Sequence, residues 1–329
     1  MNETFRALVA GHDQSPPVVT RLTDADLPDG DVTVAVAYSS LNYKDGLTVT
    51  GSLPLIQRYP MVCGIDLAGT VETSDSPAFR PGDRVLVNGY GLAETHWGGY
   101  TQRQRLRAEW LVPVPDAFTL QEAMVIGTAG YTAMLCVMAL EDAGLVPDAG
   151  EVIVTGAGGG VGSVSVTLLA LLGYRVAAST GRPELEPHLR SIGANRVLRR
   201  AELARTATEP LEEEMWTGAI DTVAGETLAT VLRQLRYGGA VAAPGVAGSF
   251  KLTVSMFPFV VRGVRLLGVD CVQCPMPRRL EAWRRLARDL PAEALAPLAS
   301  VEPLDNVPKL AEAIVAGKIR GRVVIDVNA

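Results

Sequence analysis

One stretch of the sequence decides the fold: Val152-Ile153-Val154-Thr155-Gly156-Ala157-Gly158-Gly159-Gly160-Val161-Gly162. Its apolar and β-branched start predicts a buried strand, and an apolar helical segment follows the glycines and ends near Leu172. Glycines at such a junction let the backbone approach a pyrophosphate, and the helix N-terminus adds N–H donors with partial positive charge. We therefore predict a dinucleotide-binding loop with contacts from Gly158, Gly159, Gly160 and Val161. The alternative is a plain structural turn, because Val161 breaks the strict G-x-G-x-x-G spacing.

The sequence after the glycine loop repeats the same alternation of strands and helices. Short apolar runs predict strands at 175–178, 219–223, 240–243 and 265–269, with helical stretches between them. Strands that alternate with helices favour a parallel, doubly wound sheet of about six strands. The last apolar run, 321–327, predicts a strand that returns to the first part of the chain.

The sequence before the glycine loop has a different pattern. Residues 31–38 place Val32, Val34 and Val36 on one face of a strand, Arg84–Asn88 predicts another strand, and Gly and Pro breaks are frequent. These features predict a mainly β, barrel-like domain. Thr119-Leu120-Gln121-Glu122 has the spacing of a helix capping box, so we place the domain junction there. The expected domains are 1–124 completed by 294–329, and 125–293.

Composition limits the class of protein. A chain of 329 residues exceeds one domain of roughly 100–200 residues, and 48% hydrophobic with 20% charged residues is typical of a packed globular protein. A net charge of −6 argues against nucleic-acid partners, which require a basic face. The first residues lack the pattern of a secretory signal, no membrane span is expected, and four dispersed cysteines predict reduced thiols. These features predict a cytoplasmic location.

The end of the second strand of the α/β region indicates which dinucleotide binds. Ser179-Thr180-Gly181-Arg182 stands where NAD-binding proteins place a carboxylate on the ribose hydroxyls. Small hydroxyl groups and a guanidinium suit a 2′-phosphate instead, so we predict NADPH as the cofactor. The alternative is that Arg182 only decorates the start of a helix. Arg200 is a second candidate phosphate ligand, with Arg199 as its rival.

Several blocks of the chain resemble a known family. They are, in order, Ser39-Ser40-Leu41-Asn42-Tyr43-Lys44-Asp45, Gly64-Ile65-Asp66-Leu67-Ala68-Gly69, His96-Trp97-Gly98-Gly99, Gly127-Thr128-Ala129-Gly130-Tyr131-Thr132-Ala133, Ala139-Leu140-Glu141-Asp142-Ala143-Gly144, the glycine loop and Gly268-Val269-Asp270. The chain is similar over nearly its full length to zinc-free, quinone-oxidoreductase-like members of the medium-chain dehydrogenase/reductase superfamily. It looks most like their acrylyl-CoA reductase branch.

The resemblance implies a fold, a reaction and a quaternary structure. The expected fold is α/β, with a GroES-like, mainly β catalytic domain and a Rossmann domain. The implied reaction is NADPH-dependent reduction of the carbon–carbon double bond of acrylyl-CoA, which gives propionyl-CoA, and the implied assembly is a homodimer. The resemblance also implies cofactor contacts at Val246 and Val260, for which core packing is the alternative.

Zinc is not expected. The corresponding block of zinc-dependent alcohol dehydrogenases reads Gly-His-Glu, whereas this chain reads Gly64-Ile65-Asp66. His12, His96 and His188 do not have ligand spacing, and a four-cysteine lobe is missing. The Cys271-x-x-Cys274 pair has no second pair, so we interpret it as structural.

The candidate catalytic residues are Asn42 and Tyr43. Hydride transfer to a conjugated thioester places negative charge on the acyl oxygen and requires a proton for the α-carbon. The resemblance implies that Tyr43 is a proton donor or a cofactor contact; the alternative is a wall residue, with water as the proton source. Lys44 and Asp45 are expected to stabilise the loop.

Two other functions remain open at this level. An NADPH-dependent quinone or enal reductase uses the same hydride donor and differs only in the acceptor, so the substrate is either an acyl-CoA or an enone. A non-catalytic NADPH-binding protein would share the fold without the turnover.

Overall fold

The computed structural model describes residues 4–11, 15–206 and 209–329. The chain divides into two compact units. Unit 1 comprises 1–128, 272–287 and 291–329, and unit 2 comprises 129–271 and 288–290. Each unit has its own sheets and its own hydrophobic core.

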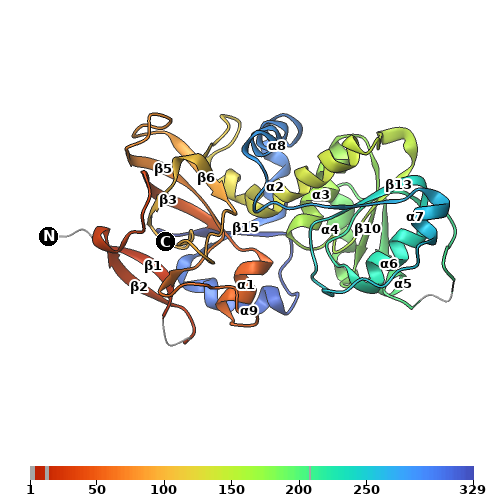
Figure 1. Cartoon of the computed structure of the whole chain (residues 1–329), viewed down its shortest axis with the longest axis horizontal. Coiled ribbons are helices and arrows are strands. Elements are labelled where there is room, and N and C mark those ends of the chain that lie inside the picture. The colour runs from red at the N-terminus through yellow and green to blue at the C-terminus, as the bar shows by residue number, and fades with distance from the viewer. Residues whose placement is uncertain (1–3, 12–14, 207–208) are drawn as a thin grey trace. The chain divides into compact units, whose positions relative to one another are not determined.

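Unit 1 is mainly β (Figure 1). Its strands are β1 (Thr4–Ala10), β2 (Val18–Thr23), β3 (Val32–Ser40), β4 (Met61–Val62), β5 (Asp66–Ser74), β6 (Arg84–Asn88), β7 (Arg103–Leu106), β8 (Val112–Pro113), β15 (Ala299–Pro303) and β16 (Arg322–Asp326). They form one sheet in the order β2-β1-β4 and a second in the order β15-β16-β3-β5-β6-β8, with β7 also paired to β3. The predicted strands at 31–38 and Arg84–Asn88 are confirmed as β3 and β6.

The core of unit 1 follows from the alternation of apolar residues. Val32, Val34 and Val36 of β3 all face inward, with exposures of 0%, 0% and 2%. Helices α1 (Tyr43–Val49) and α9 (Val307–Val315) lie side by side against this core (Figure 1). Their close packing depends on Gly46, because a Cβ there would lie 2.5 Å from Cγ2 of Ile314. Helix α8 (Met276–Asp289) lies mostly in unit 1.

The C-terminal segment completes unit 1. Strand β16 pairs antiparallel with β3, with Val324 opposite Ser40 and Ile325 opposite Ser39. The predicted return of segment 321–327 to the first part of the chain is therefore confirmed. The returning strand places Arg322 beside the end of β3, just before the segment that carries Asn42 and Tyr43.

Unit 2 is a parallel α/β layer structure. Its strands are β9 (Glu151–Val154), β10 (Arg175–Thr180), β11 (Arg196–Arg199), β12 (Trp216–Ile220), β13 (Leu235–Ala243) and β14 (Arg265–Gly268). Its helices are α3 (Gly160–Leu171), α4 (Glu186–Ser191), α5 (Arg200–Leu203), α6 (Gly225–Gln234) and α7 (Phe257–Arg262). Every strand pair is parallel, and the order is β11-β10-β9-β12-β13-β14. This is the doubly wound Rossmann order, as predicted.

Helix α2 (Leu120–Asp142) begins in unit 1 and ends in unit 2. The predicted capping box is confirmed: the Thr119 hydroxyl and amide both donate to Glu122 Oε2 at 2.8 Å, and the Glu122 amide donates to the Thr119 hydroxyl at 3.2 Å. The helix is interrupted at Gly127, where φ is +48° and ψ is −157°. By length and composition α2 could cross a membrane, but 94% of its most apolar window is buried, as in the core helix of a globular protein.

Candidate functional site

The glycine loop joins β9 to α3 at the carboxyl end of the parallel sheet. The Gly159 amide closes the turn by donating to the Gly156 carbonyl at 2.9 Å. A Cβ at Gly162 would lie 2.4 Å from the same carbonyl oxygen, so glycine is required for the helix to start this close to the strand. The first amides of α3 have no acceptor within the helix, as at any helix N-terminus, and so remain available to an anion. Gly158, Gly159, Gly160 and Val161 thus form a glycine cradle, a turn with the backbone geometry that a phosphate requires.

The loop lies where the order of the strands reverses, between β9 and β12. Ligands of open α/β sheets bind at such a switch point. Asp221, directly after β12, is fully buried and accepts from the Thr155 hydroxyl at 2.6 Å and from the Ala224 amide at 2.7 Å. Its carboxylate therefore holds together the two turns that border the switch point.

Two guanidinium groups meet at the end of β10. Arg182 Nη2 donates to the carbonyl of Gly158 at 3.0 Å, and its amide donates to the Thr180 hydroxyl at 3.1 Å. Arg200, from the start of α5, packs onto Gly181 so closely that a Cβ there would lie 2.5 Å from the Arg200 Cζ. Burial chiefly lowers the pKa of Arg182; the Glu184 carboxylate opposes this effect, and the positive charge of Arg200 adds to it.

The remaining predicted cofactor residues of unit 2 lie in different settings. Ser179 and Thr180 are buried at the end of β10, beside the glycine loop, and the Ser179 carbonyl accepts from the Ala157 amide at 3.0 Å. Val246 follows β13 and is 48% exposed, whereas Val260 lies on α7 and is 75% exposed. Neither valine is in the core, so core packing does not account for them.

In unit 1, the end of β3 and the start of α1 carry the candidate catalytic pair. Tyr43 is the first residue of α1, and its side chain is 39% exposed. Asn42 precedes it and is 7% exposed. The Asn42 amide nitrogen Nδ2 donates to Asp66 Oδ2 at 3.1 Å and to Asp45 Oδ2 at 3.2 Å. The side chain of Asn42 is thus held inside the protein, and Tyr43 is left at the surface.

Asn42 belongs to a buried network centred on Asp66. The Asp66 carboxylate accepts from the Ser40 amide at 2.9 Å and from the Thr128 amide and hydroxyl at 2.8 and 2.7 Å. Arg322 is 2% exposed and donates to the Ser40 hydroxyl at 2.7 Å, to Asn42 Oδ1 at 3.2 Å and to the carbonyl of Val125 at 3.0 Å. These contacts join β3, β5, β16 and the interrupted helix α2 around the loop that carries Tyr43.

A second carboxylate lies in the same network. Asp45 accepts from the Asn42 amide and the Ile65 amide, both at 2.9 Å, and is 1% exposed. Burial, reinforced by the negative charge of Asp66, raises the pKa of Asp45 to about 7, against these hydrogen bonds. Lys44 forms an ion pair with Glu94 at 2.6 Å. Both residues fasten the loop, as the sequence had suggested.

Asp66, Arg322 and Gly127 were not identified as site residues from the sequence. The available signal was a charged residue at the start of an otherwise apolar strand, as in Asp66-Leu67-Ala68 and Arg322-Val323-Val324-Ile325. Buried charges are normally paired, so two such residues of opposite sign are candidates for one cluster. The strand pattern alone did not show that they share it.

Within the described residues, no group of three or more His, Cys, Asp or Glu side chains could hold a metal ion. His12 lies outside the described residues. Cys271 is half-buried and Cys274 is buried, and they are not joined in a disulfide.

Two family models match the chain: the alcohol dehydrogenase GroES-like domain over residues 28–116, and the zinc-binding dehydrogenase over residues 160–288. The acrylyl-CoA reductase AcuI of Ruegeria pomeroyi is 50% identical over 99% of this chain and 100% of its own length. The structure of Escherichia coli YhdH with bound NADPH has a TM-score of 0.95 and 49% identity, and covers 98% of this chain and 100% of that one. Bacillus subtilis YhfP, solved with NAD bound, has a TM-score of 0.94 and 40% identity over 98% of this chain and 99% of that one.

This chain therefore belongs to the medium-chain dehydrogenase/reductase superfamily, in its quinone-oxidoreductase-like group. The GroES-like and Rossmann domains predicted from the sequence are confirmed.

Proposed function

We propose that this protein is an oxidoreductase that reduces the carbon–carbon double bond of acrylyl-CoA to propionyl-CoA with NADPH. The relatives that are about half identical over nearly the full chain are named acrylyl-CoA reductases, and solved relatives carry NADP or NADPH. The alternatives are an NADPH-dependent quinone or enal reductase and a non-catalytic NADPH-binding protein.

The observation that carries the cofactor choice is the pair of guanidinium groups at Gly181. A 2′-phosphate accepts charge-assisted hydrogen bonds, and two arginines that meet without a carboxylate on the strand end provide them. The glycine cradle suits the pyrophosphate, because glycines at this turn let the backbone and the free amides at the start of α3 approach a phosphate closely. NADPH, when bound there, supplies the hydride.

The residues of unit 1 would handle the charge and the proton. Addition of a hydride at the β-carbon leaves negative charge on the thioester oxygen, and a proton must then reach the α-carbon. Tyr43 is the member of the loop whose side chain is exposed, so we propose its hydroxyl as the hydrogen-bond donor or as a cofactor contact. Asn42, whose amide is engaged in the buried network, would act by fixing the position of Tyr43.

The test follows absorbance at 340 nm with acrylyl-CoA, in parallel with NADPH and NADH, and identifies the product. Propionyl-CoA formed mainly with NADPH supports the proposal. Oxidation of NADPH by quinones or enals but not by acrylyl-CoA would favour the quinone or enal reductase instead. Binding of NADPH without turnover of any of these acceptors would favour the non-catalytic alternative.

We further propose a homodimer that forms through unit 2. Strand β14 is an edge of the six-stranded sheet. Phe257 and Val261 on the preceding helix α7 are 51% and 53% exposed, and Leu266 of β14 is 37% exposed. An open strand edge next to apolar side chains favours association with a second copy. Light scattering should give twice the mass of the chain, and Leu266→Lys should shift the protein to a monomer; a monomeric wild type would remove this proposal.

We also propose a cytoplasmic location. The four cysteines form no disulfide with one another, and proteins without disulfides are usual in the reducing cytoplasm. Fractionation of the source cells that places the protein outside the cytoplasm would overturn this assignment.

A further inference from the structure

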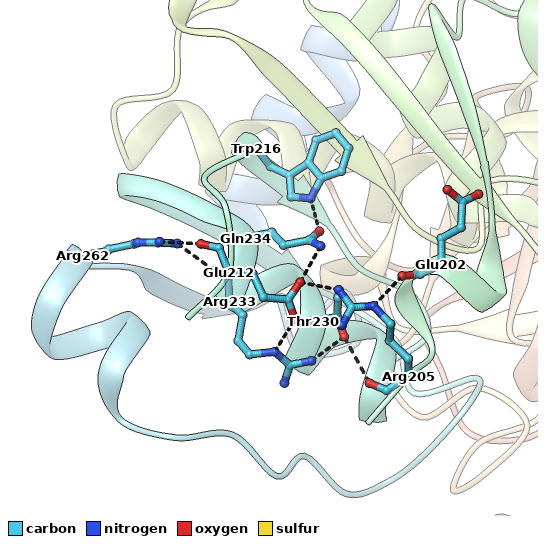
Figure 2. Close-up of polar contacts among 8 residues, drawn as sticks. All are labelled: Glu202, Arg205, Glu212, Trp216, Thr230, Arg233, Gln234 and Arg262. Carbon is cyan, nitrogen blue, oxygen red and sulfur yellow. Dashed lines mark hydrogen bonds and ion pairs between the residues drawn. The ribbon is translucent and has the colours of Figure 1, made fainter. Parts of the chain in front are cut away.

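A second polar cluster lies in unit 2, around Glu212 (Figure 2). Glu212 stands in the segment that joins α5 to β12. Its carboxylate accepts from Arg233 Nε at 3.0 Å, from Gln234 Nε2 at 2.9 Å and from Arg205 Nη2. The side chains of Glu212 and Arg233 are only 15% and 10% exposed. We call Glu212, Arg205, Arg233 and Gln234 the Glu212 cluster.

Burial alone would raise the pKa of Glu212, but the hydrogen bonds from Arg205, Gln234 and Arg233 outweigh it, and the pKa lies below its ordinary value. The carboxylate is therefore ionised at neutral pH. The backbone of the cluster is fixed as well, because Arg262 of α7 donates to the carbonyl of Glu212 at 2.6 Å and to that of Arg233 at 2.7 Å. The cluster thus connects α5, α6 and α7.

The cluster is connected to the proposed phosphate site through α5. This helix spans only Arg200–Leu203, too short to be stable by itself, so its position depends on the burial of Leu203 and on polar contacts at its two ends. At its start, the Arg199 amide donates to Glu202 Oε1 at 2.6 Å. At its end, Arg205 donates to the Glu202 carbonyl at 3.1 Å and binds Glu212 (Figure 2). Arg200, the first residue of α5, is thereby linked to α6 through Glu212.

A cavity of about 840 Å³ lies beside these elements. Its walls include Arg200 and Ala204 on one side, Arg233 of α6, and Lys251 in the loop before α7. The side chain of Arg200 therefore borders open space. Its backbone follows Arg199, which pairs with Thr180 in the sheet, and α5 is anchored by the buried Leu203. The ion pair of Arg205 with Glu212 adds a polar restraint at the end of α5.

We propose that Glu212 is a positioning residue that holds Arg200 against Gly181 and so determines the preference for NADPH over NADH. The inference rests on the proposed cofactor, since Arg200 would bind the 2′-phosphate. Glu212 itself does not touch the nucleotide in this proposal; it acts through Arg205 and α5.

The test is the substitution Glu212→Gln, which keeps the size of the side chain and removes its charge. Dissociation constants are measured for NADPH and NADH with the full-length protein, and for 2′,5′-ADP and 5′-AMP as probes with and without the 2′-phosphate. We expect binding of NADPH and 2′,5′-ADP to weaken about 5-fold or more, in line with coupling inside one polar network, and NADH and 5′-AMP to change little. Glu186→Gln, which breaks the exposed pair with Arg190, is the matched control.

A double-mutant cycle separates positioning from general loss of structure. If Glu212 acts through Arg200, then Glu212→Gln should add almost nothing in an Arg200→Ala background. Equal weakening of all four nucleotides by Glu212→Gln, or full additivity in the cycle, would overturn the proposal. If Glu212→Gln does not fold, Arg205→Met removes the same ion pair from a side chain that is 44% exposed, and the same two outcomes decide.

The wild-type measurement keeps this inference distinct from the proposed function. A wild type that binds NADPH no better than NADH would remove the cofactor assignment itself. A wild type that prefers NADPH, with a preference that Glu212→Gln leaves unchanged, would remove only the role of Glu212.

Discussion

Arg322 in unit 1 and Arg182 in unit 2 both donate to backbone carbonyls, but the first is 2% exposed and the second is half-buried. Burial lowers the pKa of Arg322, and the negative charges of Asp66 and Asp45 oppose this effect. Arg182 lies beside another arginine. The buried guanidinium is engaged in fixing a loop, whereas the half-buried guanidinium of Arg182 is the one that we propose for a ligand.

The largest expected effect is on the stability of the Asp66 network. Arg322→Met removes the positive charge that acts on the buried Asp66 carboxylate and leaves the Val125 carbonyl and Asn42 Oδ1 without this donor, so the free energy of unfolding should fall by about 3–5 kcal/mol. Chemical denaturation measures the change. Arg320→Met, at an exposed position two residues earlier, is the control. Similar small losses in both variants would show that the network does not carry the stability of this region.

A somewhat smaller loss is expected from Gly127→Ala. The residue has a positive φ of +48°, and its Cβ would lie 2.5 Å from the Ser40 hydroxyl and 2.6 Å from Arg322 Nη2. Backbone strain and crowding together should cost about 2–4 kcal/mol in thermal or chemical unfolding. Gly144→Ala also has a positive φ but meets no atom within 4 Å, so it measures strain alone. Equal losses at the two positions would mean that the network is not crowded.

In unit 2 the effect should be on binding rather than on stability. Arg182→Ala should weaken the binding of NADPH by about 1.5–3 kcal/mol, because a charge-assisted contact to phosphate is lost. The binding of NADH should change much less. Fluorescence titration with each cofactor checks this. Arg190→Ala, which removes an exposed guanidinium on α4, serves as the control. Equal weakening of NADPH and NADH by Arg182→Ala would contradict the phosphate assignment.

The smallest expected effect is the change in the free energy of unfolding for each pH unit. The pKa of Asp45 is about 7 in the folded protein and about 3.9 for an unfolded aspartate, so between these values the folded state keeps a proton that the unfolded state has lost. The stabilisation is complete below about pH 4 and is lost as pH rises to 7, by up to about 1.4 kcal/mol for each pH unit.

Asp45→Asn isolates this dependence. The difference in unfolding free energy between wild type and this variant should decrease from pH 4 to pH 7 and then level off. The contributions of the other titrating groups cancel in this difference, because both proteins contain them. A difference that stays constant with pH would show that the pKa of Asp45 is the same in the folded and unfolded states.

The local sequence determined much of the fold. The strand–glycine–helix stretch, the strand alternation around Val34, the capping box at Thr119 and the existence of a strand at 321–327 were all predicted, because each depends on neighbours only a few positions away. The sequence also placed the glycine cradle and Arg182 next to each other in one β–α–β unit. The roles of Tyr43, Val246 and Val260 remain predictions.

The tertiary structure alone decided which charges meet. Arg322 reaches Ser40 across 282 positions of the chain, and Asp66 reaches Thr128 across 62, so no local pattern could pair them. It also decided that Asn42 turns inward, that Arg200 covers Gly181, and that Glu212 joins Arg205 to Arg233. The physical reason is that hydrophobic periodicity fixes which face of an element is buried, whereas the partner of a buried charge depends on which strands become neighbours in the sheet.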